Sequence, residues 1–161
     1  MARSLRAFWN YLARAFKRIL SRDDETNAVP LTFGASELLG RGVFDSKKAK
    51  QAASGKTPPR VFRERDGVKE LSVDRLSIAD IPVLVSAHDS LRANQVIHGW
   101  AELSLDNAGK MNRSVRAAPL RSNPWHAEIT LPDVNPLDLS EEQDQHALNL
   151  AMLASWRPRP Q

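Results

Sequence analysis

The sequence contains no cysteine. This absence excludes disulfide bonds, thiolate metal ligands and a cysteine nucleophile, and it fits a reducing compartment. Long hydrophobic runs are also lacking, because no apolar stretch approaches the ~20 residues that span a bilayer. Arginines repeatedly interrupt residues 1–22, which argues against a secretory signal. We therefore expect a cytoplasmic protein, or one that attaches peripherally to a membrane.

Recognised catalytic and cofactor motifs are lacking as well. There is no G-x-S-x-G, no glycine-rich dinucleotide loop and no H-E-x-x-H. Gly55 and Lys56 resemble the end of a P-loop, but Lys50 stands where that motif requires its first glycine. We predict no cofactor and no dedicated metal site.

Positive charge is concentrated at the start of the chain. Of the 23 Lys and Arg, six lie within residues 1–22, which contain no acid; this leaves 17 cations against 19 Asp and Glu. The remainder is therefore slightly acidic, and the sequence pI of about 9.8 reflects the N-terminal segment. A high pI alone does not indicate general nucleic-acid binding here.

Residues 4–22 have the clearest helical pattern in the chain. Apolar side chains recur at intervals of three and four and form one stripe of Leu5, Phe8, Trp9, Leu12, Phe16, Ile19 and Leu20. The cations lie outside this stripe. Acidic and turn-forming residues follow, and Pro30 opposes continuation of the helix. We predict a basic amphipathic helix over 1–22, a linker over 23–31 and a single domain over 32–161.

Several interpretations of this helix stay open. Its stripe can pack against its own domain, dock on a partner protein or an acidic partner surface, or lie on an anionic membrane face. An organellar presequence has similar physics. The linker is typical of a joint, which favours docking over intramolecular packing.

The rest of the chain mixes strands with segregated helices. We predict a helix over 45–55, with Asp45 or Ser46 as N-cap and Gly55 just beyond its end. Asp66-Gly67 indicates the turn of a hairpin within 60–73. Within the domain, a second helix is expected after the one over 45–55, and it should begin at Ser77 and Asp80, which resemble a capping box.

Further strands are predicted over 95–105, 115–120 and 125–131, with a loop over 106–114. Ser140 and Gln143 then form a capping box for a last helix, whose buried stripe is expected to contain Leu148, Ala151 and Met152. This order lacks a βαβ rhythm and predicts an α+β fold with a small antiparallel sheet.

Histidines and acids alternate on two of these strands. His126 and Glu128 share one face of their strand, and His98 and Glu102 share a face with Trp100. If the strands are neighbours, the histidine pair suits acid–base cleavage of RNA, with Arg113, Arg116 or Arg121 on the phosphate; the four side chains also suit a divalent metal. The ordinary polar face of a sheet is the favoured interpretation.

Three other residues have competing interpretations. Trp100 is expected either to form a contact surface for a partner or to be covered by the N-terminal helix over 1–22 or the last helix. His88 lies near the end of the second helix, where a cation suits the helix dipole, and His146 lies within the last helix. Both histidines are predicted to be structural.

A basic stretch within residues 41–63 is the best phosphate-contact candidate outside the N-terminal helix. Its cations are Arg41, Lys47, Lys48, Lys50, Lys56 and Arg60. Such a run is more often a solvated face.

The succession of "LSVDRLS", "HGWAEL", "NPWHAEITLP" and "ALNLAMLA" resembles a pattern found in small uncharacterised bacterial proteins. The resemblance covers roughly residues 58–155 and implies a bacterial cytoplasmic setting and a compact α+β domain, with no activity attached.

The sharpest signal is the docking helix, whereas the catalytic signals are diffuse. Our leading hypothesis is a non-enzymatic interaction or accessory protein that docks through this helix on a partner protein or anionic surface. One alternative is a toxin-type ribonuclease or other small hydrolase with a histidine pair. Another is phosphate-backbone binding of nucleic acid through residues 41–63.

Overall fold

The computed structural model describes residues 29–34, 36–64, 68–92, 94–111, 113–130 and 139–161. Within this part, Leu31–Gln161 form one compact unit. The predicted amphipathic helix over 1–22 and most of its linker lie outside the described residues, so those predictions stay untested.

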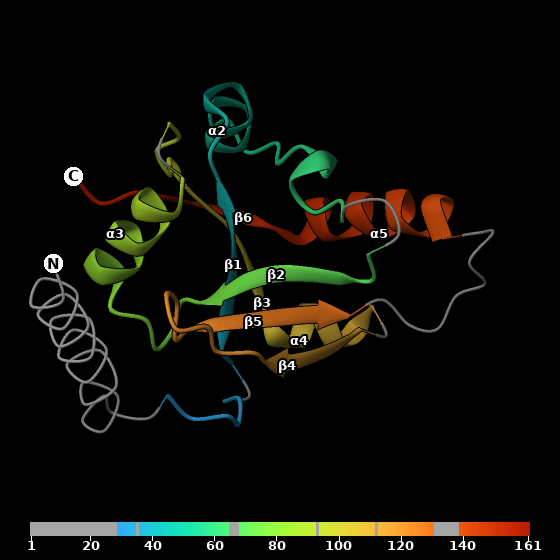
Figure 1. Cartoon of the computed structure of the whole chain (residues 1–161). Helices are drawn as coiled ribbons and strands as arrows, with labels where there is room; N and C mark the ends of the chain where they lie inside the picture. Colours follow the sequence, from blue (N-terminus) through green and yellow to red (C-terminus); the bar gives the residue numbers. More distant parts are fainter. Residues whose placement is uncertain (1–28, 35, 65–67, 93, 112, 131–138) are drawn as a thin grey trace, which may run out of the picture. The chain divides into compact units, whose positions relative to one another are not determined.

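Six strands form one antiparallel sheet in the order β4-β5-β2-β1-β3-β6 (Figure 1). Their bounds are β1 Leu38–Val43, β2 Glu70–Arg75, β3 Gly99–Ser104, β4 Ser114–Ala117, β5 His126–Thr130 and β6 Ser155–Pro158. The described residues of this unit also form four α-helices and one 3₁₀ turn: α2 Ser46–Ala53, η1 Pro59–Val61, α3 Ile81–Leu91, α4 Leu105–Lys110 and α5 Leu139–Leu153. The predicted α+β class and antiparallel sheet are confirmed.

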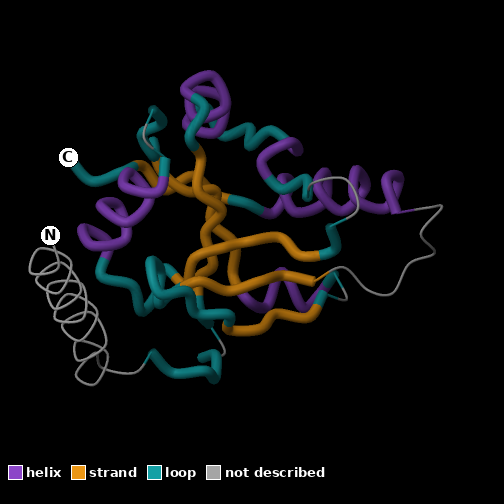
Figure 2. The backbone as a smooth tube through the Cα atoms, in the orientation of Figure 1, coloured by secondary structure: helices purple, strands orange, loops and turns teal. Residues whose placement is uncertain are grey.

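Helices cover both faces of the sheet. On one face, α5, η1 and α2 bury Leu150, Phe62 and Ala49 against strand residues such as Leu39 and Ile129. On the other face, α3 packs against a smaller cluster of Leu76, Leu84, Ile97 and Trp100. Figure 2 shows the helices lying on either side of the central strands. Both faces of β1 are therefore covered near the sheet centre.

Caps explain where two of the helices begin. Asp45 accepts from the backbone N–H groups of Lys47 and Lys48, so α2 begins and ends as predicted, with Gly55 at φ +83° beyond it. The predicted start of the second helix at Ser77 is wrong. Asp80 caps α3 instead, and the Ser77 hydroxyl accepts from the Leu38 backbone N–H.

Two further local predictions are wrong. The hairpin predicted within 60–73 lacks its first strand among the described residues, because Pro59–Val61 is a 3₁₀ turn and β2 pairs with β1 and β5. Asp66 and Gly67 themselves lie outside the described residues. The expected loop over 106–114 contains α4, whose N-terminus is capped by the Ser104 hydroxyl accepting from the Asn107 N–H.

The stripe predicted for the last helix is confirmed at Ala151 and wrong at Leu148 and Met152. The buried residues of this helix are Gln143, Ala147, Leu150 and Ala151, whereas Leu148 and Met152 are exposed. Gln143 donates to the Val68 carbonyl, and the Ser140 hydroxyl accepts from Arg63, so both predicted capping residues make tertiary contacts.

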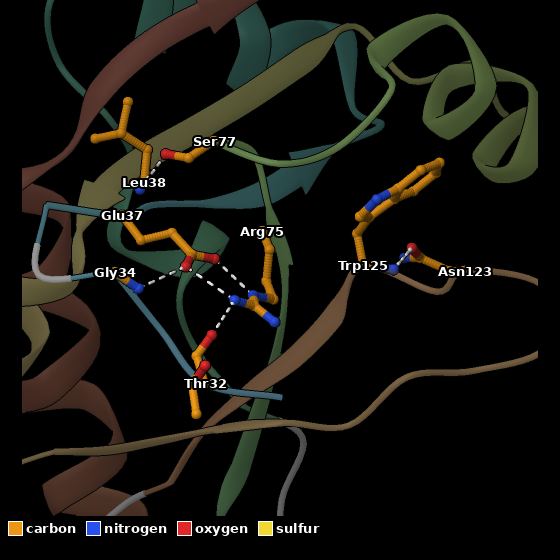
Figure 3. A network of polar contacts seen from close by, with 8 residues as sticks. All are labelled: Thr32, Gly34, Glu37, Leu38, Arg75, Ser77, Asn123 and Trp125. Atoms are coloured by element: carbon orange, nitrogen blue, oxygen red, sulfur yellow. Dashed lines mark hydrogen bonds and ion pairs between the residues drawn. The ribbon is translucent and has the colours of Figure 1, made fainter. Parts of the chain in front are cut away.

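A buried ion pair attaches the segment before β1 to the sheet (Figure 3). The Arg75 guanidinium donates to both carboxylate oxygens of Glu37, one of them at 2.9 Å, and to the Thr32 carbonyl at 2.8 Å. Glu37 also accepts from the Gly34 N–H, and Arg75 lies over the Phe33 ring at 4.3 Å. Burial would raise the pKa of Glu37, but the hydrogen bond from Arg75, that from the Gly34 N–H and the charge of Arg75 together outweigh it and hold that pKa below its ordinary value.

Candidate functional site

The sheet opens between its two central strands. β1 and β2 pair at only two positions, Leu39 with Arg75 and Gly40 with Asp74. Beyond Gly40, β1 continues only along β3, and β2 continues only along β5. Figure 1 shows β2 running across the direction of β1 at this point. The opening exposes backbone groups that an uninterrupted ladder would pair.

The side chain of Arg41 bridges this opening. Its Nη1 donates to the Ser72 carbonyl at 2.7 Å, and its Nε donates to the Val61 carbonyl at 3.3 Å. Two backbone carbonyls on separate segments therefore hold the guanidinium in place. The charge of Arg41 also acts on the Glu64 carboxylate, whose pKa it lowers against the effect of burial. Two cavities adjoin this region, and both are lined by Arg41, Gly42, Phe44 and Arg92.

The first cavity, of about 570 Å³, collects cations from three segments of the chain. We call it the basic cavity; the charged residues that line it are Arg41, Lys47, Lys48, Arg60, Arg92 and Asp45. Arg92 lies over the Phe44 ring at 4.0 Å and donates to Gln95 at 3.1 Å. Among the described residues, no carboxylate forms a salt bridge with Lys47, Lys48 or Arg60. The cavity wall therefore carries five cations and one acid.

Asp45 is the single acid on this wall, and its charge has a local function. The Lys48 backbone N–H, followed by that of Lys47 and the charges of both lysines, holds the pKa of Asp45 below its ordinary value. Because the carboxylate occupies the first N–H groups of α2, the helix end is already capped. An anion in this cavity would be bound by the lysine and arginine side chains.

The second cavity, of about 430 Å³, is built around a buried carboxylate. We call it the histidine cavity; its polar lining includes Ser72, Asp74, His88, Asn123 and His126. Asp74 is only 3% exposed and accepts three hydrogen bonds: His88 Nε2 at 2.7 Å, Trp100 Nε1 at 2.8 Å and Asn123 Nδ2 at 2.7 Å. These bonds satisfy the carboxylate and fix α3 against the sheet.

Each of the two histidines has a defined tautomer when neutral. An ionised carboxylate can only accept, so His88 carries its proton on Nε2 and has a lone pair on Nδ1. His126 is bonded through Nδ1 to the Ala118 carbonyl at 2.7 Å, so its lone pair is on Nε2. Neither lone-pair nitrogen has a hydrogen-bond partner in the described part of the chain.

The histidine pair predicted from sequence is not brought together. β2 and β1 lie between β5, which carries His126, and β3, and His98 precedes β3 and is exposed. The two glutamates are separated by the same two strands, and each is paired with arginine. Glu128 contacts Arg116 at 2.6 Å, and Glu102 contacts Arg157 at 2.8 Å.

The structure assigns the other candidates to different roles. Trp100 is fully buried beneath α3, not beneath the last helix, and is unavailable as a partner surface. The predicted N-terminal helix lies outside the described residues, so its part in that prediction stays untested. Arg113 is buried against Glu64, whereas Arg121 is exposed and does not line the histidine cavity. Within the basic stretch, Arg41, Lys47, Lys48 and Arg60 line the basic cavity, whereas Lys50 and Lys56 do not.

Sequence reasoning missed His88 and Asp74 as site residues. The signal for His88 was its spacing, because it follows Ile81, Leu84 and Val85 on the stripe of α3 that faces the sheet. A histidine on a buried stripe requires a polar partner. Asp74 gave a weaker signal. It is an acid directly after Val73 in a strand-like run, and a carboxylate that is buried in a strand requires a polar partner.

His146 lies in a buried ionic cluster that adjoins the histidine cavity through Glu64. Its Nδ1 accepts from Arg113 Nε at 3.2 Å, and Arg113 Nη1 contacts Glu64 at 3.0 Å. Burial, followed by the charge of Arg113, lowers the pKa of His146. Burial also raises the pKa of Glu64 and lowers that of Arg113. Neither His146 nor Arg113 lines the two cavities.

No family model, curated protein or solved structure matches this chain. Among the described residues, no helix is long and apolar enough to cross a bilayer. The same residues contain no group of three or more histidine and acidic side chains arranged to hold a metal ion.

Proposed function

We propose that this protein binds nucleic acid through its phosphate groups, with the basic cavity as the contact site. The observation that supports this most directly is the convergence of Arg41, Lys47, Lys48, Arg60 and Arg92 on one concave surface. Cations that gather from separate segments around a cavity create a local attraction for phosphate that a scattered surface charge does not.

The arrangement of these cations also suits a polymer. A volume of about 570 Å³ can hold a phosphate and its sugar, and the cavity is open to solvent along the exposed side chains of Lys47 and Arg60. Arg41 is held by two backbone carbonyls, so less side-chain entropy is lost when it binds an anion. Flexible lysines at the rim can adapt to successive phosphates.

Docking through the N-terminal helix stays a prediction from the sequence alone. The basic amphipathic pattern of residues 4–22 supports it, with a protein partner or an anionic membrane face as its target. Such docking is compatible with a nucleic-acid contact elsewhere on the chain, because the two use different residues.

Binding of a fluorescent single-stranded RNA oligonucleotide, followed by anisotropy at several salt concentrations, tests the proposal. We expect log K to fall linearly with log salt, with a slope of about −0.7 for each phosphate contacted. Lys47→Gln and Arg60→Gln should each weaken binding and make the slope shallower by about 0.7.

Lys56→Gln is the matched control. Lys56 is an exposed cation of the same sequence stretch and lies outside the basic cavity. Its replacement should leave the slope nearly unchanged. Equal losses from Lys56→Gln and Lys47→Gln would contradict binding in the cavity. Removal of residues 1–22 separates this contact from the N-terminal helix: if all binding disappears with that deletion, the cavity is not the site.

A further inference from the structure

We infer that the histidine cavity is an acid–base centre that cleaves RNA beside a phosphate held by the basic cavity. This inference rests on the proposed function and goes beyond it by assigning a reaction and a substrate class. His88 and His126 are the two proton-transferring residues, and Asp74 is a positioning residue.

The two histidines flank a single carboxylate. His126 lies directly opposite Asp74 on neighbouring antiparallel strands, which places their Cα atoms about 4.5 to 5.5 Å apart. His88 reaches the same carboxylate from α3, with its Nε2 at 2.7 Å. Three elements of the fold, β2, β5 and α3, therefore bring both rings to the wall of one cavity.

The hydrogen bonds give the two rings different tasks. His126 donates from Nδ1 to the Ala118 carbonyl, which leaves the Nε2 lone pair to accept a proton as a general base. The Asp74 carboxylate orients His88 and compensates the charge of its ring when both nitrogens carry protons. In that form, Nδ1 of His88 can donate a proton as a general acid.

RNA supplies its own nucleophile for such a pair. His126 Nε2 removes the proton of a ribose 2′-hydroxyl, and the 2′-oxygen forms a bond to the adjacent phosphorus. The bond from phosphorus to the 5′-oxygen breaks, and that oxygen takes the Nδ1 proton of His88. The products are a 2′,3′-cyclic phosphate and a 5′-hydroxyl, and proton exchange with water restores both rings.

The wall shared by the two cavities places positive charge beside these rings. Arg41 and Arg92 line both cavities, so their guanidinium groups lie at the boundary between the cations of the basic cavity and the imidazoles of the histidine cavity. The inference places the reacting phosphate at this boundary. Guanidinium groups fixed next to the phosphorus would stabilise the negative charge that develops on its oxygens.

Isosteric variants can test this assignment without removing the hydrogen bonds that hold the fold. The amide of His126→Asn can still donate to the Ala118 carbonyl, and the amide of His88→Gln can still donate to Asp74. Neither amide transfers protons. His98→Gln, at an exposed histidine outside both cavities, is the matched control.

The experiment measures binding and cleavage separately on one labelled RNA oligonucleotide and on the same sequence in DNA. We expect wild type and His98→Gln to cleave only the RNA and to leave 2′,3′-cyclic phosphate ends, identified by mass spectrometry. His88→Gln and His126→Asn should bind RNA like wild type and cleave about 10²- to 10⁴-fold more slowly.

Three outcomes would overturn the inference. Wild type that binds RNA without cleaving it would leave the proposed function standing and remove the reaction. Cleavage that is unchanged in both isosteric variants would show that other groups carry it. Cleavage of DNA at a similar rate would exclude the 2′-hydroxyl as nucleophile. An absence of RNA binding, in contrast, refutes the proposed function itself.

Discussion

Replacement of Arg113 by methionine should be among the most destabilising single changes in this fold. The side chains of Arg113 and Glu64 are both 0% exposed, and Arg113 Nη1 lies 3.0 Å from the Glu64 carboxylate. Arg113→Met leaves that carboxylate buried without its hydrogen-bonded counter-ion, and only the more distant charge of Arg41 still acts on it. Breaking one partner of a buried pair typically costs about 3 to 5 kcal/mol, a large part of the roughly 5 to 15 kcal/mol that holds a domain together.

Urea unfolding followed by tryptophan fluorescence measures this loss, and thermal unfolding should show a decrease in Tm of roughly 10 to 20 °C. Arg116→Met is the matched control, because Arg116 also pairs with a glutamate but its side chain is 66% exposed. An exposed pair contributes less than about 1 kcal/mol. Equal losses in the two variants would refute the argument from burial.

The double variant Glu64→Leu/Arg113→Met distinguishes the cost of an unpaired buried charge from the contribution of the ion pair itself. Removing both charges also removes the cost of desolvating them, and Nη2 of Arg113 has no hydrogen-bond partner among the described residues. We expect the double variant to recover most of the stability lost in Arg113→Met. A double variant as unstable as the single one would show that Arg113 acts through its packing.

The effect of Arg113→Met should also depend on pH. Burial raises the pKa of Glu64 above the ordinary 4.5, so the folded state favours its neutral form. Stability from this group is fully present below pH 4.5 and is lost as pH rises through the folded pKa. Without Arg113, which lowers that pKa, the penalty at neutral pH increases. The loss of stability should therefore be smaller at acidic pH than at neutral pH.

Three further changes have defined outcomes. Trp100→Phe removes one donor to the buried carboxylate of Asp74 and should lower the free energy of unfolding by about 1 to 3 kcal/mol, measured by urea titration; an unchanged midpoint would contradict this. Gly40→Ala would place a Cβ in steric overlap with Leu76 Cδ1, and the overpacking should cost about 1 to 3 kcal/mol by the same assay, whereas no loss would mean that the Leu76 side chain moves aside without cost. Deletion of residues 1–22 should leave a cooperative thermal transition while abolishing capture of a partner; loss of the transition would mean that the helix belongs to the core.

Local chemistry determined which elements could be predicted from the sequence. Helix α2 has Asp45 at its N-cap and Gly55 beyond its end, and both act within a few residues, so its limits could be predicted. The alternation in β5 likewise identified Ala127 and Ile129 as core residues. The α+β class followed from such local patterns.

Elements that depend on distant partners could not be predicted. Strand β1 contains Gly40 and Gly42, which are poor strand formers, and it is held by pairing with β3 along its whole length. Strand β6 contains Pro158, yet it pairs with β3 through Trp156 and Arg157. A proline is compatible with an edge strand, and sequence alone could not show which edge β6 joins.

The candidate site shows the same limitation. His126 was identified because strand alternation is visible in the sequence, but its partner depended on strand order. Two intervening strands separate β5 from β3, and His88 reaches the carboxylate opposite His126 from a helix. The cations of residues 41–60 were named from the sequence, whereas Arg92 joins them only through the folding of α3 against Phe44.

The order of strands in this sheet has a consequence for how the chain folds. Among the described ladders, only β4 and β5 are joined by a short connection; β2 must find β5, and β3 must find β6, across long stretches of sequence. Loop closure must therefore be completed before most of the pairing energy is gained, and high contact order places such folds on a timescale of milliseconds to seconds. During that interval the uncovered edges of β1 and β3 are open to pairing with other chains, so refolding yield should fall as protein concentration rises.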